Sequence, residues 1–363
     1  MNNIDIVTVN FEGVEDVVSL IKSVKSNFEG LNLVVIDNNS SQNIYNQLVL
    51  QLNEEFNNKK FNFNQLIYLE HSNGKFRTIS KATNSKNENN NLIIIRNDSN
   101  CGFSCANNIG IEYLIHNSSN EFYWLLNNDL ILNNDTLDNL NIELISLDSS
   151  VGIIGTKMLY LKNNHKTNIV LSFGGRKKSR LVNLGKVDGK GLKNNNDSSY
   201  ELNGYVNGGS MIVKKDLYLK IGELPNEYFL DLEDVEYSLR AMKNKYKLYY
   251  LNKVIVYHKE GGTFNIAEKR SIKSFFRRYY AFRNEILIVN NYFNSIEKLM
   301  YYIILLPLKF IFFILRIIYF NDTHKIKRIK LIVKAILDGF LKRTGKTIDP
   351  KKWINQFRNY NEK

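Results

Sequence analysis

The sequence predicts an α/β fold in which a mainly parallel, mixed sheet is flanked by helices. In the first third of the chain, short apolar runs typical of buried strands alternate with segments whose apolar residues recur at helical spacing. This alternation implies parallel strands joined by right-handed crossovers. The chain of 363 residues is long enough to bury a full core, and its charged fraction of 23% is ordinary for a folded protein.

Two strands and two helices open the chain. We place them, in the order strand, helix, strand, helix, at residues 4–10, 14–26, 31–36 and 43–52. Ligands of parallel sheets collect at the carboxyl ends of the strands. Here those ends are the polar segments Thr8–Asn10 and Asp37–Ser40.

The segment from residue 61 to residue 91 has a weaker pattern. Leu66–Leu69 is compatible with a strand, whereas residues 72–91 are polar, rich in Asn and Lys and without periodicity. We expect residues 72–91 to form an exposed, mobile loop before the next strand, at residues 92–96.

A glycine-containing turn at Arg96–Gly110 leads into a helix of small residues that ends near His116. Backbone N–H groups at the start of such a helix can face a diphosphate, and small side chains let a ligand approach the backbone. Loops of this composition are common, so an ordinary turn is an alternative interpretation.

The stretch Tyr123–Leu130 predicts a buried strand that ends in two amides and a carboxylate, those of Asn127, Asn128 and Asp129. A carboxylate in this position suits a divalent cation that meets a phosphate. A polar turn is the alternative, because Asn and Asp both favour turns.

The second half of the chain continues with both kinds of element. We expect a helix at 135–147, a strand at 151–158, a polar, Gly-rich excursion at 162–200 with a short strand at 169–173, a strand at 205–213, a helix at 215–221 and a strand at 247–256. The excursion is expected to lie over the substrate site.

Acidic residues are concentrated between Tyr228 and Arg240, where four of them fall within six positions. Val235 and Leu239 indicate a helix that packs against the core. Capping of the helix N-terminus explains one or two of these carboxylates. It does not explain so dense a cluster, which indicates a catalytic site.

The two cysteines, Cys101 and Cys105, are too few for a disulfide scaffold and lack the spacing of a zinc site. We expect both to be reduced thiols in a reducing compartment. The N-terminal residues lack the basic and apolar regions of a secretory signal, which also favours a cytoplasmic location.

Charge is distributed unevenly along the chain. Of the 49 Lys and Arg residues, 21 lie from Lys269 onward, against 6 of the 36 Asp and Glu residues. The first 268 residues are therefore close to neutral. A basic C-terminal quarter indicates a polyanionic partner, and a membrane surface fits better than nucleic acid because no recognition motif for nucleic acid is present.

The C-terminal quarter also contains two apolar stripes. Residues 299–320 are nearly all apolar and long enough to cross a bilayer. Lys309 and Arg316, seven residues apart, favour a helix that lies in the membrane interface. A second helix at residues 326–340 combines an apolar stripe with lysines that suit anionic lipid headgroups. A pair of packed helices that closes the domain is the alternative.

Several of these motifs occur together in a known order. They are Val9-Asn10, Val35–Ser40, the Asn100-x-Gly-Phe-x-x-x-Asn-x-x-Gly110 segment, Leu126–Asp129, Gly208–Ser210, the Glu233-Asp234-x-Glu236-x-x-x-Arg240 segment and His258. Over residues 3–290 the sequence resembles the family 2 glycosyltransferases, and most closely the rhamnosyltransferase-like proteins of bacterial surface-polysaccharide assembly. The resemblance implies a GT-A fold, an inverting mechanism and a nucleotide-diphosphate sugar donor, dTDP- or UDP-linked.

The resemblance also implies a role for each motif at the donor end. Asp129 would bind Mg²⁺ or Mn²⁺, with His258 as a second protein ligand. Asn127 departs from the family's Asp-x-Asp pattern, in which an Asp stands first. Asp37 falls where the family reads the base or ribose. The other residues that would contact the donor are Val9, Asn10, Asn39, Asn100, Gly102, Asn107 and Asn128.

Asp234 aligns with the general base of the family, and Glu233 would orient acceptor hydroxyls or support Asp234. For Glu236 and Arg240, an ion pair on the helix face is the favoured interpretation. We therefore expect an enzyme that transfers a sugar, rhamnose being one candidate, to a glycan or lipid-linked acceptor. The alternative is an inactive relative that binds nucleotide or glycan.

The expected organisation has two parts. Residues 1–268 would form the catalytic domain, with a nucleotide-binding half at about 1–130 and an acceptor half at about 131–268. Residues 269–363 would form a helical, membrane-associating extension. This arrangement implies a cytoplasmic protein attached peripherally to the inner face of the cytoplasmic membrane.

Overall fold

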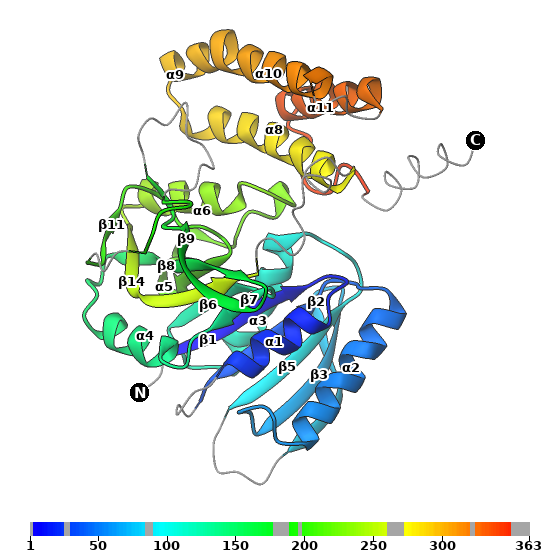
Figure 1. Ribbon diagram of the computed structural model, residues 1–363, viewed down its shortest axis with the longest axis vertical. Helices are drawn as coiled ribbons and strands as arrows, with labels where there is room; N and C mark the ends of the chain where they lie inside the picture. Colours follow the sequence, from blue (N-terminus) through cyan, green and yellow to red (C-terminus); the bar gives the residue numbers. More distant parts are fainter. Residues whose placement is uncertain are drawn as a thin grey trace.

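The computed structural model describes residues 3–24, 30–83, 90–176, 189–194, 198–259, 272–319 and 324–349. A twelve-stranded mixed sheet occupies its lower half in Figure 1 and four C-terminal helical segments lie above it. The strands are β1 Ile4–Asn10, β2 Asn32–Asp37, β3 Gln65–Ser72, β4 Lys75–Thr83, β5 Asn91–Asn97, β6 Phe122–Asn127, β7 Leu130–Leu132, β8 Val151–Lys162, β9 His165–Ser172, β11 Tyr200–Leu202, β13 Ser210–Lys214 and β14 Lys247–His258. A separate small sheet pairs β10 Gly175–Arg176 with β12 Gly204–Tyr205.

The main path of the sheet runs β11-β14-β8-β13-β6-β1-β2-β5-β3-β4. From β6 to β3 all neighbouring strands are parallel, and β13 is antiparallel to both β6 and β8. The mainly parallel mixed sheet predicted from the sequence is confirmed. Because Asn10 is level with Asp37, and Val9 with Asn127, the polar ends of β1, β2 and β6 meet at one edge of the sheet.

Helices cover both faces of the sheet. One face packs against α1 Glu15–Ser23, α2 Gln42–Asn57 and α4 Thr136–Ile145. The other packs against α3 Phe103–Asn117, α5 Lys215–Ile221 and α6 Glu233–Lys243. Their boundaries lie within a few residues of the predicted ones, except that α2 extends to Asn57. The two apolar layers account for the continuous apolar runs of the central strands, which are buried on both faces.

The prediction of a loop at residues 72–91 is wrong for most of that segment. β3 turns back at Asn73-Gly74 and pairs with β4 as an antiparallel hairpin. Both turn residues have positive φ, 51° and 70°, the conformation that two-residue hairpins need and that Asn-Gly favours. Nearly every side chain of β4 is exposed, so the strand has no apolar alternation to reveal it. Residues 84–89 of the predicted loop lie outside the described residues.

A second hairpin replaces the start of the predicted excursion at 162–200. β8 runs through Lys162, and β9 returns antiparallel to it after a turn in which Asn163 and Asn164 have positive φ. Asn is one of the few side chains that tolerates this conformation. Residues 177–188 and 195–197 of the excursion lie outside the described part of the chain.

The C-terminal helices pack against α6 and against the segment that precedes it. α8 Ile272–Tyr292 lies between α6 and the outer helices (Figure 1). The outer layer consists of α9 Ser295–Met300, the π-helical turn Tyr301–Leu305, α10 Leu306–Tyr319 and α11 Lys325–Phe340. Pro307 cannot donate to the preceding turn, and a wider π turn just before it accommodates the missing hydrogen bond. The continuous helix Ser295–Tyr319 is long and apolar enough to cross a membrane, by length and composition.

Candidate active site

Hydrogen bonds connect the polar ends of β1, β2 and β6. The side-chain amide of Asn10 donates to Asp37 Oδ1 at 3.2 Å, and Asn10 Oδ1 accepts from the amide of Asn128 at 3.2 Å. Asp37 is buried, which raises the pKa of its carboxyl group, while hydrogen bonds from Ser40 and the charge of Arg96 act in the opposite direction. These predicted donor-binding residues therefore form one connected polar surface. Val9 is half-buried and packs into the apolar core beside them.

Asn38 is a site residue that the sequence prediction did not include. Its amide donates to Asn100 Oδ1 and to the Gly102 carbonyl, both at 3.2 Å, and its own oxygen accepts from the Cys101 N–H at 3.2 Å. Asn38 thus joins the turn after β2 to the loop before α3. Its neighbour Asn39 has a left-handed backbone, with φ of 63°. The polar turn Asp37–Ser41 was the only signal in the sequence for both.

The loop before α3 approaches the segment before α6 closely. Gly102 has φ of 94°, and a Cβ built on it would lie 2.5 Å from the carbonyl oxygen of Phe229. Only glycine fits this position without displacing the backbone. Asn100 Oδ1 accepts a hydrogen bond from the Gly102 N–H at 3.1 Å. The predicted donor residue Asn107 is buried and donates to the Phe103 carbonyl of its own helix at 3.0 Å.

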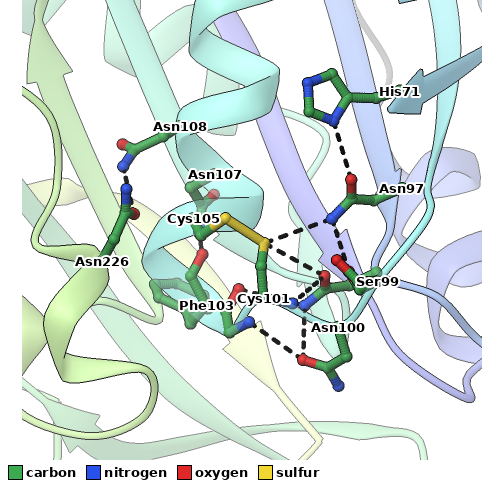
Figure 2. Close-up of a disulfide and its surroundings, with 12 residues drawn as sticks. His71, Asn97, Ser99, Asn100, Cys101, Phe103, Cys105, Asn107, Asn108 and Asn226 are labelled. Atoms are coloured by element: carbon green, nitrogen blue, oxygen red, sulfur yellow. Dashed lines mark hydrogen bonds between the residues drawn. A yellow bond between two sulfur atoms is a disulfide. The ribbon is translucent and has the colours of Figure 1, made fainter. Parts of the chain in front are cut away.

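Cys101 and Cys105 form a disulfide, so the expectation of two reduced thiols is wrong (Figure 2). Cys101 lies two residues before α3, and Cys105 lies in its first turn, which places their Cα atoms 5.7 Å apart. That separation is within the range for disulfides. The count of cysteines and the assumed compartment gave no indication that the start of a helix would bring the pair together.

Asp129 and His258 lie beside each other. After Asp129 the chain reverses into β7, which pairs antiparallel with β14 so that Leu130 is opposite His258. This pairing places His258 Nε2 3.4 Å from Asp129 Oδ1. Burial raises the pKa of the Asp129 carboxyl, and the charge of His258 opposes that rise.

The Asp129–His258 pair fits a divalent cation. Asp129 Oδ1 and His258 Nδ1 are buried and have no hydrogen-bond partner in the part of the chain that the structure describes. Carboxylate oxygen and imidazole nitrogen are both ligands of Mn²⁺, and the carboxylate also suits Mg²⁺. Among the described residues, no group of three or more His, Cys, Asp or Glu side chains is arranged so that it could hold a metal ion. A cation held here would take its remaining ligands from substrate and water.

The acidic cluster begins α6. Asp234 Oδ2 accepts from the Gly208 N–H and Oδ1 from the Val235 N–H, both at 2.8 Å. Glu233 is buried, and its Oε2 has no hydrogen-bond partner among the described residues. The positive end of the helix dipole favours both carboxylates at this position.

Burial raises the pKa values of both carboxyl groups. The pKa of Asp234 rises to about 6, although the Gly208 and Val235 hydrogen bonds lower it. The pKa of Glu233 rises well above its ordinary value, first through burial and then through the charge of Asp234. A carboxylate with a pKa near 6 is largely ionised at neutral pH and still basic enough to accept a proton in a transition state.

The turn at Asn207–Gly209 connects the acidic pair to the end of β6. The Gly209 carbonyl accepts from the Asn127 N–H at 2.9 Å, while the Gly208 N–H holds Asp234. This turn is therefore bonded both to Asn127, two residues before Asp129, and to Asp234 of the acidic pair. Farther along α6, Glu236 and Arg240 form the expected ion pair on the helix face, at 3.0 Å.

Comparisons with known proteins agree with this architecture, although no family model matches the chain. A structure of GalNAc-T7 with UDP, GalNAc and Mn²⁺ superimposes with a TM-score of 0.53 at 15% identity, over 83% of this chain and 50% of that one. The fold is that of the GT-A glycosyltransferases. The low-salt glycan biosynthesis hexosyltransferase Agl10 of Haloferax volcanii is 23% identical over 249 residues, covering 68% of this chain and 75% of the relative. A mannosyltransferase of Pyrobaculum calidifontis, with GDP-Man and Mn²⁺, matches with a TM-score of 0.48 at 10% identity, over 92% and 73% of the two chains.

Burial of the Glu233 carboxyl group predicts that the free energy of unfolding depends on pH. The pKa of Glu233 is higher in the folded protein than in the unfolded chain. Below about pH 4.5 the carboxyl group is protonated in both states, and burial then costs no charge. As the pH rises through the folded-state pKa, ionisation favours the unfolded chain and the free energy of unfolding falls. Glu233→Gln removes that ionisation. We expect it to raise the free energy of unfolding at pH 8, because the glutamine side chain carries no charge that burial would penalise. The gain should vanish near pH 4.

Urea unfolding at several pH values measures this difference. Glu236→Gln is a matched control on the same helix: burial raises the pKa of Glu236 as well, but this carboxylate has partners in Arg240 and the Tyr292 hydroxyl, so its gain in stability at pH 8 should be smaller. Equal losses in both variants would show that Glu233 is stabilised by partners rather than buried at a cost.

Proposed function

We propose that the chain is an inverting glycosyltransferase. It transfers a sugar from a nucleotide-diphosphate donor to a hydroxyl of a glycan or lipid-linked acceptor in cell-surface polysaccharide assembly. The observation that carries the proposal is the acidic pair, whose Asp234 has a pKa near 6 and is anchored to the turn that also holds the end of β6. The GT-A fold and the similarity to a glycan biosynthesis hexosyltransferase support it.

The donor would bind at the carboxyl ends of β1, β2 and β6. Asn10, Asp37 and Asn128 supply a connected row of hydrogen-bonding groups for the nucleoside. At the start of α3 the N–H groups of residues 101–103 already donate within the protein, so phosphate oxygens would meet those of Ser104 and Cys105. Asp129 and His258 would hold Mg²⁺ or Mn²⁺ beside the diphosphate. The bound cation supplies charge that stabilises the departing nucleoside diphosphate.

The acceptor reaction belongs to Asp234. Its carboxylate takes the proton of an acceptor hydroxyl as that oxygen attacks the anomeric carbon, while the bond from this carbon to the diphosphate oxygen breaks on the opposite face. One inversion of configuration results. Glu233, adjacent and buried, would orient the acceptor hydroxyl. Rhamnose from a dTDP-linked donor and a hexose from a UDP-linked donor are the two donor classes to test first.

One observation favours a second candidate function. Asn127 stands where an Asp-x-Asp motif would have its first carboxylate, which leaves Asp129 as the sole carboxylate of the motif. A relative that binds nucleotide or glycan without catalysis would tolerate this change. Hydrolysis of the donor in the presence of Mn²⁺ separates the two functions, because a binding protein would release no nucleoside diphosphate.

We further propose that the protein is cytoplasmic and attached to the inner face of the cytoplasmic membrane through α9 and α10. Exposed apolar side chains recur at spacings of three and four residues along this helix. They are Ile296, Leu299, Met300, Ile303, Ile304, Leu308, Ile311, Phe312, Leu315, Ile318 and Tyr319. Lys309, one of the two cations that favoured a helix in the membrane interface, pairs with Glu285 of α8. The apolar face therefore points away from the protein, as expected for a helix in the membrane interface, and the basic helix α11 packs against α10.

Asp234→Asn should abolish transfer and leave donor binding intact. Asparagine cannot accept the hydroxyl proton but keeps the size of the side chain, so we expect kcat to fall by about 100-fold or more. Release of nucleoside diphosphate from a panel of nucleotide sugars first identifies the donor, and calorimetry then measures its affinity for the variant. Unchanged turnover would refute Asp234 as the base.

Asp129→Ala and His258→Ala should each weaken Mn²⁺ binding in the presence of UDP by about 10-fold or more, because each removes a ligand of the cation. Electron paramagnetic resonance of free Mn²⁺ measures this directly, without an activity assay. Asp148→Ala, which removes a surface carboxylate held only by Ser150, is the control. Equal Mn²⁺ affinity in all three variants would contradict the proposed site.

Phe312→Glu together with Leu315→Glu should abolish binding to vesicles that contain phosphatidylglycerol, because two charges enter the exposed apolar face. Co-sedimentation measures binding of the unaltered chain, which should weaken with added salt and with a lower fraction of anionic lipid. Leu219→Glu changes an equally exposed leucine on α5 and should have no effect. Vesicle binding that survives the double substitution would exclude this face.

A further inference from the structure

The segment that delivers the acidic pair has an unusual backbone. We define the acidic turn as residues 227–232, immediately before Glu233. Within it Phe229, Asp231 and Leu232 have φ of 60°, 63° and 68°, the left-handed region that residues with a Cβ rarely adopt. Such conformations persist only where the surroundings hold them in place, and they concentrate at functional sites. The structure must therefore contain contacts that hold this turn.

Asn284 of α8 provides the largest set of these contacts. The side-chain amide nitrogen of this fully buried residue donates to three carbonyl oxygens of the acidic turn. The distances are 3.0 Å to Tyr228, 2.8 Å to Leu230 and 2.6 Å to Asp231. Arg283 Nε donates to Asn284 Oδ1 at 2.8 Å, which fixes the orientation of the amide.

Arg283 adds two more hydrogen bonds. Its guanidinium, also fully buried, donates to the Glu227 carbonyl at 3.0 Å and to the Tyr228 carbonyl at 2.8 Å. The Phe229 carbonyl is the one that α8 does not contact, and it accepts from the Phe103 N–H at the start of α3, at 3.0 Å. Each carbonyl from residue 227 to residue 231 is therefore held, four by α8 and one by the donor side of the site.

A third residue of α8 holds a side chain of the acidic turn. Arg277 Nε lies 2.7 and 2.9 Å from the two carboxylate oxygens of Asp231. The charge of Arg277 also lowers the pKa values of Glu233 and Asp234, against the larger effect of burial. The helix that begins the basic C-terminal quarter thus contacts the acidic site through both backbone and charge.

We infer that Arg283 and Asn284 are positioning residues for Glu233 and Asp234, so that α8 is a working part of the active site and not only a support for the membrane-facing helices. The inference rests on the proposed function. By fixing the carbonyls of the strained turn, the pair sets the direction in which the chain enters α6. That direction determines where the two carboxylates stand relative to the Gly208 N–H and the donor.

Asn284→Asp tests the inference with little change in size. The substitution removes the only side-chain donor to the Leu230 and Asp231 carbonyls among the residues that the structure describes, and it places a carboxylate against them. Asn290→Asp is the matched control: it is the same change on the same helix, at a residue whose oxygen accepts from the Tyr302 hydroxyl and can still do so as a carboxylate. Circular dichroism confirms the fold of both.

Hydrogen exchange of the full-length protein gives a readout independent of activity. Peptides covering residues 227–238 should exchange at least several-fold faster in Asn284→Asp than in Asn290→Asp. With a donor identified, kcat should fall by about 10- to 100-fold, the cost of misplacing a catalytic group. The affinity for UDP with Mn²⁺ should be retained, because no donor residue is altered. Unaltered exchange, or faster exchange with unaltered kcat, would overturn the inference.

Arg277→Gln provides a second test if Asn284→Asp fails to fold. The Arg277 side chain is 62% exposed, so its loss should leave the fold intact. Without its charge the pKa of Asp234 should rise, and the acid limb of the profile of kcat/KM against pH should move to higher pH. A merely structural role predicts no such movement, and a fixed profile would overturn the inference. If no sugar donor is turned over at all, the proposed function fails, while hydrogen exchange still decides whether α8 holds the turn.

Discussion

The hydrogen bond from the Gly208 N–H to Asp234 connects the start of α6 to the turn beside the end of β6. On one side, the turn that contains Gly208 is bonded to the end of β6, where the Asn-Asn-Asp motif begins. On the other, Asp234 opens the helix that packs against the C-terminal segment. A Cβ at Gly208 would lie only 3.2 Å from that of Asp234, so the absence of a side chain allows the approach. The proposed donor and acceptor sites are therefore linked through this backbone contact.

Burial raises the pKa values of Glu233 and Asp234, and it does so at a cost in the stability of the fold. Glu233 is almost fully buried with one oxygen unpaired in the described structure, an arrangement that a fold optimised for stability alone would avoid. The left-handed residues before it add to the cost. The hydrogen bonds of Arg283 and Asn284 offset this strain. Strain, burial and compensation all fall within a few residues of the proposed base, which is the pattern expected where function limits stability.

The sequence predicted what depends on apolar periodicity and missed what depends on long-range contacts. The central strands and α5 agree with their predicted positions because their side chains are buried in regular order. Asp129 and His258 were paired by resemblance, and the antiparallel pairing of β7 with β14 brings them to 3.4 Å. No local pattern could show that Asn284 holds a turn more than fifty residues earlier in the chain. The disulfide and the two Asn-containing hairpins depend on backbone conformations that composition hides.

The strand β4 has a consequence for how the molecule behaves at high concentration. It is the last strand of the main sheet path, so one of its edges has no partner strand within the described sheet. Such edges recruit strands from other molecules and start aggregation. β4 carries Lys75, Arg77 and Lys81, and nearly all its side chains are exposed. Positive charges along the open edge repel a second copy, so the polar segment that resembled a loop protects the sheet from intermolecular pairing.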